Sequence, residues 1–144
     1  MAAAGPQSGV RFAAEVTADL AEMATARDTL AGALQECGWS QEDAFRVLIC
    51  ANEAMANAMS HGSAPVGMID LRFRVSTTAA AFVIGDHCVG VIDIPQSEAL
   101  PDDTCEHGRG VILMRALADT FRTWRRSEGT MVALAFRTAE GSAR

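Results

Sequence analysis

The chain has 144 residues, of which 49% are hydrophobic, and a formal net charge of −6 at pH 7. This length fits one domain with a single core, and the negative charge argues against nucleic acid as the main partner, because phosphate contacts need clustered positive charge. All twelve basic residues are arginines, which excludes a Walker-type nucleotide loop with its phosphate-binding lysine. No apolar run is long enough to span a membrane, and the start of the chain does not resemble a secretory signal. We expect a cytoplasmic protein.

The first part of the chain predicts one strand and two helices. Apolar residues alternate over 10–16, as in a half-buried strand. Apolar residues at helical spacing then predict a helix over 17–37, which Gly38 can end. A second helix is expected from Ser40, where the sequence SQED resembles a capping box, to about residue 60.

The second part is richer in strands. Clean alternation predicts strands over 66–76 and 80–86, joined by a short turn into a hairpin. The aperiodic stretch 87–107 is expected to be a functional or disordered loop, because connections of this length are uncommon in compact domains. The remaining predicted elements are a helix over 109–119 and strands over 121–126 and 130–136.

This order of elements places helices between hairpins. It predicts an α+β fold, namely a two-layer sandwich with helices packed on one face of a mixed, mostly antiparallel sheet. The strand patterns agree, because one face of the sheet is apolar and the other carries arginines. The folded domain is expected at 10–137, between flexible tails at 1–9 and 138–144.

The second predicted helix carries an acid, an amide and an imidazole at steps of four residues, namely Glu53, Asn57 and His61. Because a helix turns about 100° per residue, these side chains form one stripe. Such a stripe is ordinarily just the solvated face of a helix. Here the small or soft neighbours, mostly alanine and methionine, leave room for a ligand. A carboxylate can accept a proton from an attacking hydroxyl, and an amide oxygen can ligate Mg²⁺.

Two strand ends carry weaker signals. Asp86 ends a predicted strand and Gly90 follows shortly after. A carboxylate in this place can accept hydrogen bonds from a flat ring with donors, although an aspartate at a strand end is ordinarily a turn residue. Thr130 opens the last predicted strand after Gly129, where most such pairs simply end a hairpin.

A third signal lies at the start of the third predicted helix, where Gly108, Arg109 and Gly110 stand in sequence. Bare backbone amides and the helix dipole favour a phosphate there. Arg109 can add a bidentate contact. The simpler interpretation is a glycine-rich helix entry without a ligand.

The segments NEAMANAMSHG, GDHCVG, GRGVILMRALAD and EGTMVAL occur in this order, with a long loop before the third. Together they resemble the GHKL superfamily of ATP-binding domains, whose fold is the Bergerat fold. Over about residues 10–137 the chain is similar to the small anti-sigma-factor serine kinases of that superfamily. The resemblance implies a Mg-ATP-dependent protein serine kinase that phosphorylates a small anti-anti-sigma partner of the STAS type. It further implies that the protein sequesters a sigma factor and forms a homodimer.

The resemblance also implies roles for single residues. Glu53 would be the general base and Asn57 the Mg²⁺ ligand. Asp86 would accept a hydrogen bond from the adenine amino group. Gly90 would lie beside the adenine ring, and Thr130 would lie near it.

On the phosphate side, the resemblance identifies 87–107 as the ATP lid. Gly108, Arg109 and Gly110 would close over the phosphates. His61 falls on a histidine that is common at this place in the superfamily.

Two positions depart from the family pattern. Val91 stands where an aromatic residue often follows the second glycine of the Asp-x-Gly-x-Gly motif. Cys88 stands where the first glycine of the Asp-x-Gly-x-Gly motif is usual, and a Cβ there can weaken nucleotide binding, since glycine allows close backbone approach. One alternative is therefore a GHKL module that binds nucleotide weakly or is not catalytic, and that only binds protein partners. A separate alternative is a catalytic domain of the histidine-kinase type. Two cysteines and two histidines flank the lid and could bind zinc tetrahedrally: His87, Cys88, Cys105 and His107. Their spacing is not that of a known zinc knuckle.

Overall fold

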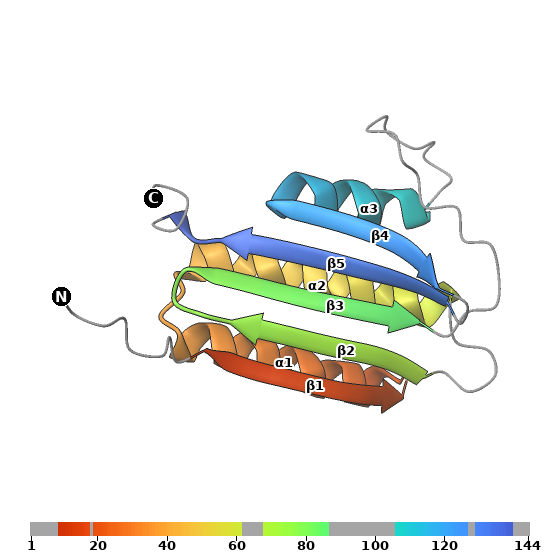
Figure 1. Ribbon diagram of the computed structural model, residues 1–144, viewed down its shortest axis with the longest axis horizontal. Coiled ribbons are helices and arrows are strands. Elements are labelled where there is room, and N and C mark those ends of the chain that lie inside the picture. The colour runs from red at the N-terminus through yellow and green to blue at the C-terminus, as the bar shows by residue number, and fades with distance from the viewer. Residues whose placement is uncertain (1–8, 18, 62–67, 87–105, 127–128, 140–144) are drawn as a thin grey trace.

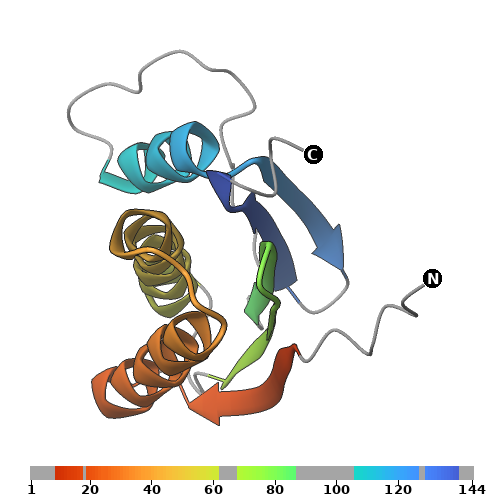
Figure 2. The same ribbon diagram turned by 90° about the vertical axis from the view of Figure 1, so that its left-hand side faces the viewer.

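The computed structural model describes residues 9–17, 19–61, 68–86, 106–126 and 129–139. Within this part of the chain, five strands and three helices form two layers (Figure 1). The elements are β1 (Val10–Thr17), α1 (Leu20–Glu36), α2 (Gln41–His61), β2 (Met68–Val75), β3 (Ala79–Asp86), α3 (Glu106–Leu117), β4 (Thr120–Arg126) and β5 (Gly129–Arg137). The helices cover one face of the sheet and leave the other face open (Figure 2). The predicted α+β sandwich is confirmed.

The sheet has the strand order β1-β2-β3-β5-β4, and all pairings among the described strands are antiparallel. β2 and β3 form the predicted hairpin, in which the Ser76 hydroxyl accepts a hydrogen bond from the Ala79 amide at 3.1 Å. The register aligns one apolar row across the five strands: Phe12, Phe73, Phe82, Leu134 and Phe121.

Local caps fix the bounds of α1. The Asp19 carboxylate accepts a hydrogen bond from the Glu22 amide at 2.8 Å, so the helix begins at Leu20, later than the predicted start at 17. Gly38 follows the helix with φ of 78°, which confirms the predicted stop because glycine tolerates this conformation. No helix among the described residues is long and apolar enough to cross a lipid bilayer.

The start of α2 is joined to the far ends of α3 and β5. The Ser40 hydroxyl caps the helix by accepting a hydrogen bond from the Asp43 amide at 3.1 Å, whereas the Asp43 carboxylate pairs with Arg46. Arg46 also donates to the backbone carbonyls of Leu117 at 2.8 Å and Arg137 at 2.9 Å. This one side chain therefore fixes the C-terminal end of α3 against α2.

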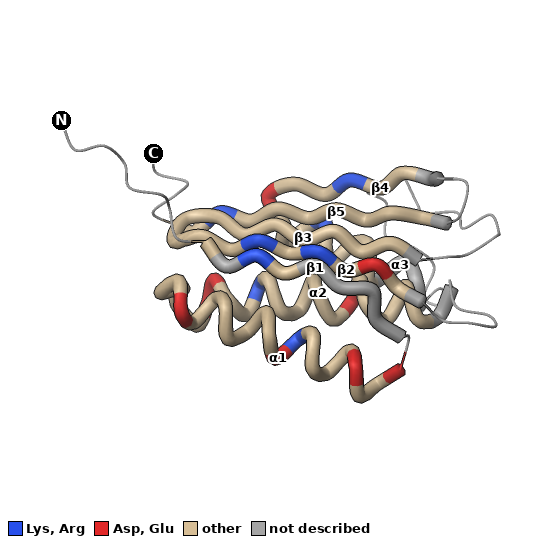
Figure 3. Tube along the Cα trace, turned by 60° about the horizontal axis from the view of Figure 1, so that its bottom comes forward, with Lys and Arg blue, Asp and Glu red and all other residues tan. Residues whose placement is uncertain are grey.

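The strands divide their side chains between the two faces of the sheet. In β2, Leu71 and Phe73 are buried under the helices, whereas Arg72 and Arg74 are exposed on the open face. Figure 3 shows basic residues along the strands and several acidic residues along α1. The predicted alternation in this strand is therefore confirmed.

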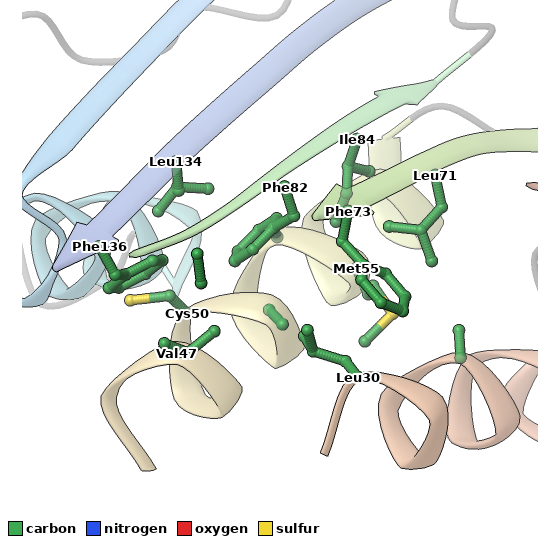
Figure 4. Packing of buried hydrophobic residues seen from close by; sticks show 14 of the residues in the cluster. Leu30, Val47, Cys50, Met55, Leu71, Phe73, Phe82, Ile84, Leu134 and Phe136 are labelled. Atoms are coloured by element: carbon green, nitrogen blue, oxygen red, sulfur yellow. The ribbon is translucent and has the colours of Figure 1, made fainter. Parts of the chain in front are cut away.

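The core lies between the helices and the sheet. Phe82 stacks on Phe136 with ring centroids 5.9 Å apart, and Val47 and Cys50 of α2 pack beside them (Figure 4). Burying a side chain as large as phenylalanine stabilises a fold by about 1.5–3 kcal/mol. This packing holds α2 against the middle of the sheet and so fixes the polar stripe on that helix.

Candidate active site

The polar stripe of α2 is not on the solvated face of the helix. Asn52 and Ala56 occupy the exposed face, whereas Glu53 and Asn57 are half-buried. The interpretation of the stripe as an ordinary solvated surface is therefore wrong for these two side chains. His61 belongs to α2, but the position of its side chain lies outside the description.

Gly110 of α3 lies directly against this stripe. A Cβ atom on Gly110 would lie 2.7 Å from Oε2 of Glu53. It would lie 3.4 Å and 3.6 Å from the amide nitrogen and oxygen of Asn57. The missing side chain thus allows the backbone of α3 to approach an acid and an amide at once. Three of the residues predicted from the sequence come together here.

The approach takes place near the positive end of α3. The helix begins at Glu106, three residues before its predicted start, so Gly110 lies in its first turns. The first four backbone amides of an α-helix have no partner within the helix. They favour anions, as does the helix dipole. The Glu53 carboxylate therefore lies close to a segment that suits negatively charged ligands.

This donor set fits the cofactors implied by the sequence. Carboxylate and amide oxygens are ligands that Mg²⁺ prefers, and the start of α3 offers amides of the kind that bind phosphate. The close approach of Gly110 places Glu53 and Asn57 beside this segment of α3.

The strand register brings the backbones of Asp86 and Thr130 near each other at the end of the sheet. The ladder between β3 and β5 pairs Gly85 with Met131. The same antiparallel register, continued by one residue, puts Asp86 opposite Thr130. Thr130 is 5% exposed. The end of β3, the second half of α2 and the start of α3 lie at the same end of the molecule (Figure 1).

Several predicted site residues lie wholly or partly outside this description. Gly90 and Cys88 belong to residues 87–105, outside the described part of the chain. The backbones of Asp86, Gly108 and Arg109 are described, but the side chains of Asp86 and Arg109 and the surroundings of Gly108 are not. The roles of these residues remain predictions.

The zinc interpretation is also untested, because His87, Cys88 and Cys105 lie outside the described residues and only the backbone of His107 is described. Within the described ranges, no group of three or more histidine, cysteine, aspartate or glutamate side chains could hold a metal ion. The described cysteines, Cys37 and Cys50, are free thiols in the core.

Sequence reasoning missed the environment of Cys50. Its side chain is fully buried one turn before Glu53. The pKa of the Cys50 thiol is raised to about 11, chiefly because the thiol is buried; the charge of Arg46 opposes the shift and that of Glu53 adds to it. Cys50 therefore stays protonated at neutral pH and is a core residue rather than a nucleophile. The sequence signal for this environment was the spacing of three residues between Cys50 and Glu53, which places the two side chains next to each other on a helix.

Comparison with known proteins identifies the class of this domain. Residues 16–136 match the family model of the histidine kinase-like ATPase domain. The match covers most of the chain, so the chain belongs to this family, which confirms the GHKL resemblance. No curated protein sequence matches the chain.

The fold recurs in a solved structure, that of the RsbU and RsbW domains of Rv1364c from Mycobacterium tuberculosis. The TM-score is 0.66 at 18% sequence identity, over 90% of this chain and 32% of that chain. The present chain thus spans about a third of the length of that neighbour. At this identity the similarity shows a shared fold.

Proposed function

We propose that this chain is a Mg-ATP-dependent protein serine kinase that phosphorylates a small anti-anti-sigma protein of the STAS type and also binds a sigma factor. The observation that carries the proposal is the approach of Gly110 to Glu53 and Asn57 in a histidine kinase-like ATPase domain. The choice of partners rests on the resemblance of the motifs to anti-sigma-factor serine kinases. The fold shared with the RsbU and RsbW domains supports the same choice.

Glu53 would act on the attacking hydroxyl. Its carboxylate is half-buried beside α3, and no ion pair or hydrogen bond engages it within the described part of the chain. It can therefore orient the serine hydroxyl and accept its proton. The amide of Asn57, one turn further along α2, would hold Mg²⁺, which when bound neutralises charge on the phosphates.

The remaining predicted residues would position the nucleotide. At the start of α3, Gly108 would bind phosphate oxygens through its backbone amide and Arg109 through its guanidinium group, and Gly110 would let the phosphates approach the helix closely. Asp86 and Thr130 would bind the adenine at the adjoining strand ends. Phosphoryl transfer depends mainly on such positioning and on charge neutralisation.

Isothermal titration with ATP, with and without Mg²⁺, tests the proposal. We expect binding that strengthens with Mg²⁺. Asp86→Asn should weaken it, because the adenine donor loses a charged acceptor. Asp28→Asn, an exposed position on α1, removes the same charge elsewhere and should leave affinity unchanged. Absence of binding at millimolar ATP would leave the protein-binding module as the function.

Cys88 favours that second candidate, because it replaces a glycine that is usual on the adenine side. Cys88→Gly restores the family pattern and should bind ATP equally well or more tightly with an unchanged fold. A marked loss of binding would mean that Cys88 belongs to the working site. Zinc analysis of the purified protein would then test whether the thiol ligates a metal.

A further inference from the structure

The open face of the sheet carries a hollow of about 450 Å³. It lies at the end of the sheet where β3 begins and β5 ends, away from the end that holds the start of α3 (Figure 1). Four alanines with small side chains line it: Ala79, Ala80, Ala81 and Ala135. The charged residues around it are Arg11, Arg74, Arg137 and Asp119.

Two of these arginines face each other across neighbouring strands. Arg11 of β1 and Arg74 of β2 are register partners, and like charges directly opposite each other destabilise a sheet. Both side chains are exposed, and within the described residues neither has an ion pair or a hydrogen bond. Asp119 accepts a hydrogen bond from the Arg137 amide at 2.6 Å and is one acid among three arginines.

The positive charge of this face contrasts with the net charge of −6 of the chain. Arg72 and Arg122 are exposed further along the open face and extend the positive surface. The described acids on this face are the exposed Asp119 and the half-buried Asp70, whereas α1 in the other layer carries further exposed acids, such as Glu22 and Asp28 (Figure 3). A surface of this kind steers and binds a negatively charged partner.

We propose that this hollow is a docking site for an acidic segment of a partner protein. Neighbouring strands lie about 4.8 Å apart. Arg11 on β1 and Arg137 on β5 are three strands apart and offset by two residues along the strands, so they are separated by about 16 Å. One carboxylate cannot reach both. In an extended segment with an acid at every second residue, the acidic side chains lie on one face about 7 Å apart. Three such acids can therefore reach along the arginines of the hollow, from Arg11 to Arg137. The alanine floor leaves room for the segment. This surface does not depend on the nucleotide site.

Other occupants fit less well. Single-stranded nucleic acid binds through stacking on exposed aromatic rings, but Phe136, the aromatic residue among those lining the hollow, is 0% exposed. A second copy related by a two-fold axis would present the same patch on both subunits. It would thus bring Arg11 and Arg74 close to the equivalent arginines.

Fluorescence anisotropy without nucleotide tests the proposal with a labelled pentapeptide of alternating aspartate and valine. We expect the protein to bind it, and Arg74→Glu and Arg11→Glu each to weaken binding by at least about tenfold. Arg27→Glu is the matched control, because Arg27 is exposed on α1 and the change in net charge is identical. Its affinity should stay within about twofold of the unaltered protein. Added salt should weaken binding, and a peptide with asparagine in place of aspartate should not bind.

Four results would overturn the proposal. These are equal effects of Arg74→Glu and Arg27→Glu, equal binding of the asparagine peptide, tighter binding of a short oligothymidine, and a dimer in ultracentrifugation that Arg74→Glu dissociates. Circular dichroism of each variant checks the fold, and Arg74→Gln serves as a milder variant at the same position. ATP titration of the same proteins separates failure of this proposal from failure of the kinase proposal.

Discussion

Gly110 lies so close to Glu53 that a methyl group on the glycine would approach Oε2 of the carboxylate to 2.7 Å. The carboxylate is the far end of a flexible side chain and can move away. The two helices cannot easily separate, because Arg46 joins the start of α2 to the carbonyl of Leu117 at the end of α3. The glycine therefore determines where the acid lies more than whether the domain folds.

We accordingly predict that Gly110→Ala folds normally but loses activity. Alanine favours a helix over glycine by about 1 kcal/mol, which offsets the local crowding. Displacing the Glu53 carboxylate by about 1 Å can cost on the order of 10²-fold in turnover. Chemical denaturation measures the stability, and phosphate transfer to the serine partner measures the activity.

A double variant controls this prediction. If Gly110→Ala acts through Glu53, adding it to Glu53→Ala should cause little further loss of turnover, because residues that work through one contact are not additive. Independent, additive losses would show that Gly110 acts by another route, such as contact with the phosphates.

We predict that substituting alanine for two further glycines changes the stability in opposite directions. Gly32 is exposed within α1, and a Cβ atom added to it would have no atom within 4 Å, so Gly32→Ala should stabilise the protein by about 0.5–1 kcal/mol. Gly38 has φ of 78°, and Gly38→Ala should destabilise it by about 1–2 kcal/mol. Urea denaturation of the two variants checks both signs. An equal effect of the two substitutions would contradict the backbone explanation.

The sequence predicted the fold class because each element carries a clear period. The alternation of Leu71 and Phe73 with Arg72 and Arg74 required a strand with one buried face. Such local patterns could not predict contacts between distant segments of the chain. The bond from Arg46 to the carbonyl of Leu117 joins residues 71 positions apart, and no local pattern encodes it.

The same division holds for the candidate site. The four-residue steps are enough to place Glu53 and Asn57 on one stripe, because the helical period alone determines it. Whether that stripe faces solvent or a second helix depends on the packing of α3. The backbone of Gly110 lies against both side chains, so the stripe faces α3. The high pKa of Cys50 could not be predicted in this way, since the effect of burial appears only once the core is formed.

Stability should fall at alkaline pH through Cys50. Its pKa is raised from 9.0 to about 11 in the folded protein, chiefly by burial. Between these two values the unfolded chain has released the proton that the folded protein still holds. Stability therefore decreases as pH rises from 9 to about 11 and then levels off. The chain has no lysine or tyrosine to titrate in this window. Denaturation at several pH values should show the decrease in the wild type.

Cys50→Ala provides the comparison for this prediction. The variant should be less stable at pH 7, because it leaves a small cavity beside Phe136. Its stability should nevertheless depend less on pH above 9 than that of the wild type. Identical slopes for the two proteins would show that other groups cause the alkaline loss.

Glu53 and Asn57 share one stripe but should fail in different ways. Glu53→Ala removes the proposed proton acceptor and leaves the amide one turn away in place. Loss of a general base typically costs about 10²–10⁴-fold in rate, so phosphate transfer to the serine partner should collapse while ATP affinity stays nearly normal. Asn57→Ala removes a proposed Mg²⁺ ligand and should lower both Mg²⁺-dependent ATP affinity and turnover. Titration calorimetry and mass-resolved phosphate transfer measure the two effects separately.

Asn52→Ala, on the exposed face of α2, is the control for both variants and should change neither ATP affinity nor turnover. A Glu53→Ala variant that phosphorylates its partner at the wild-type rate would remove Glu53 from the role of base. Loss of the folded state in both variants would instead make the stripe a structural contact between α2 and α3.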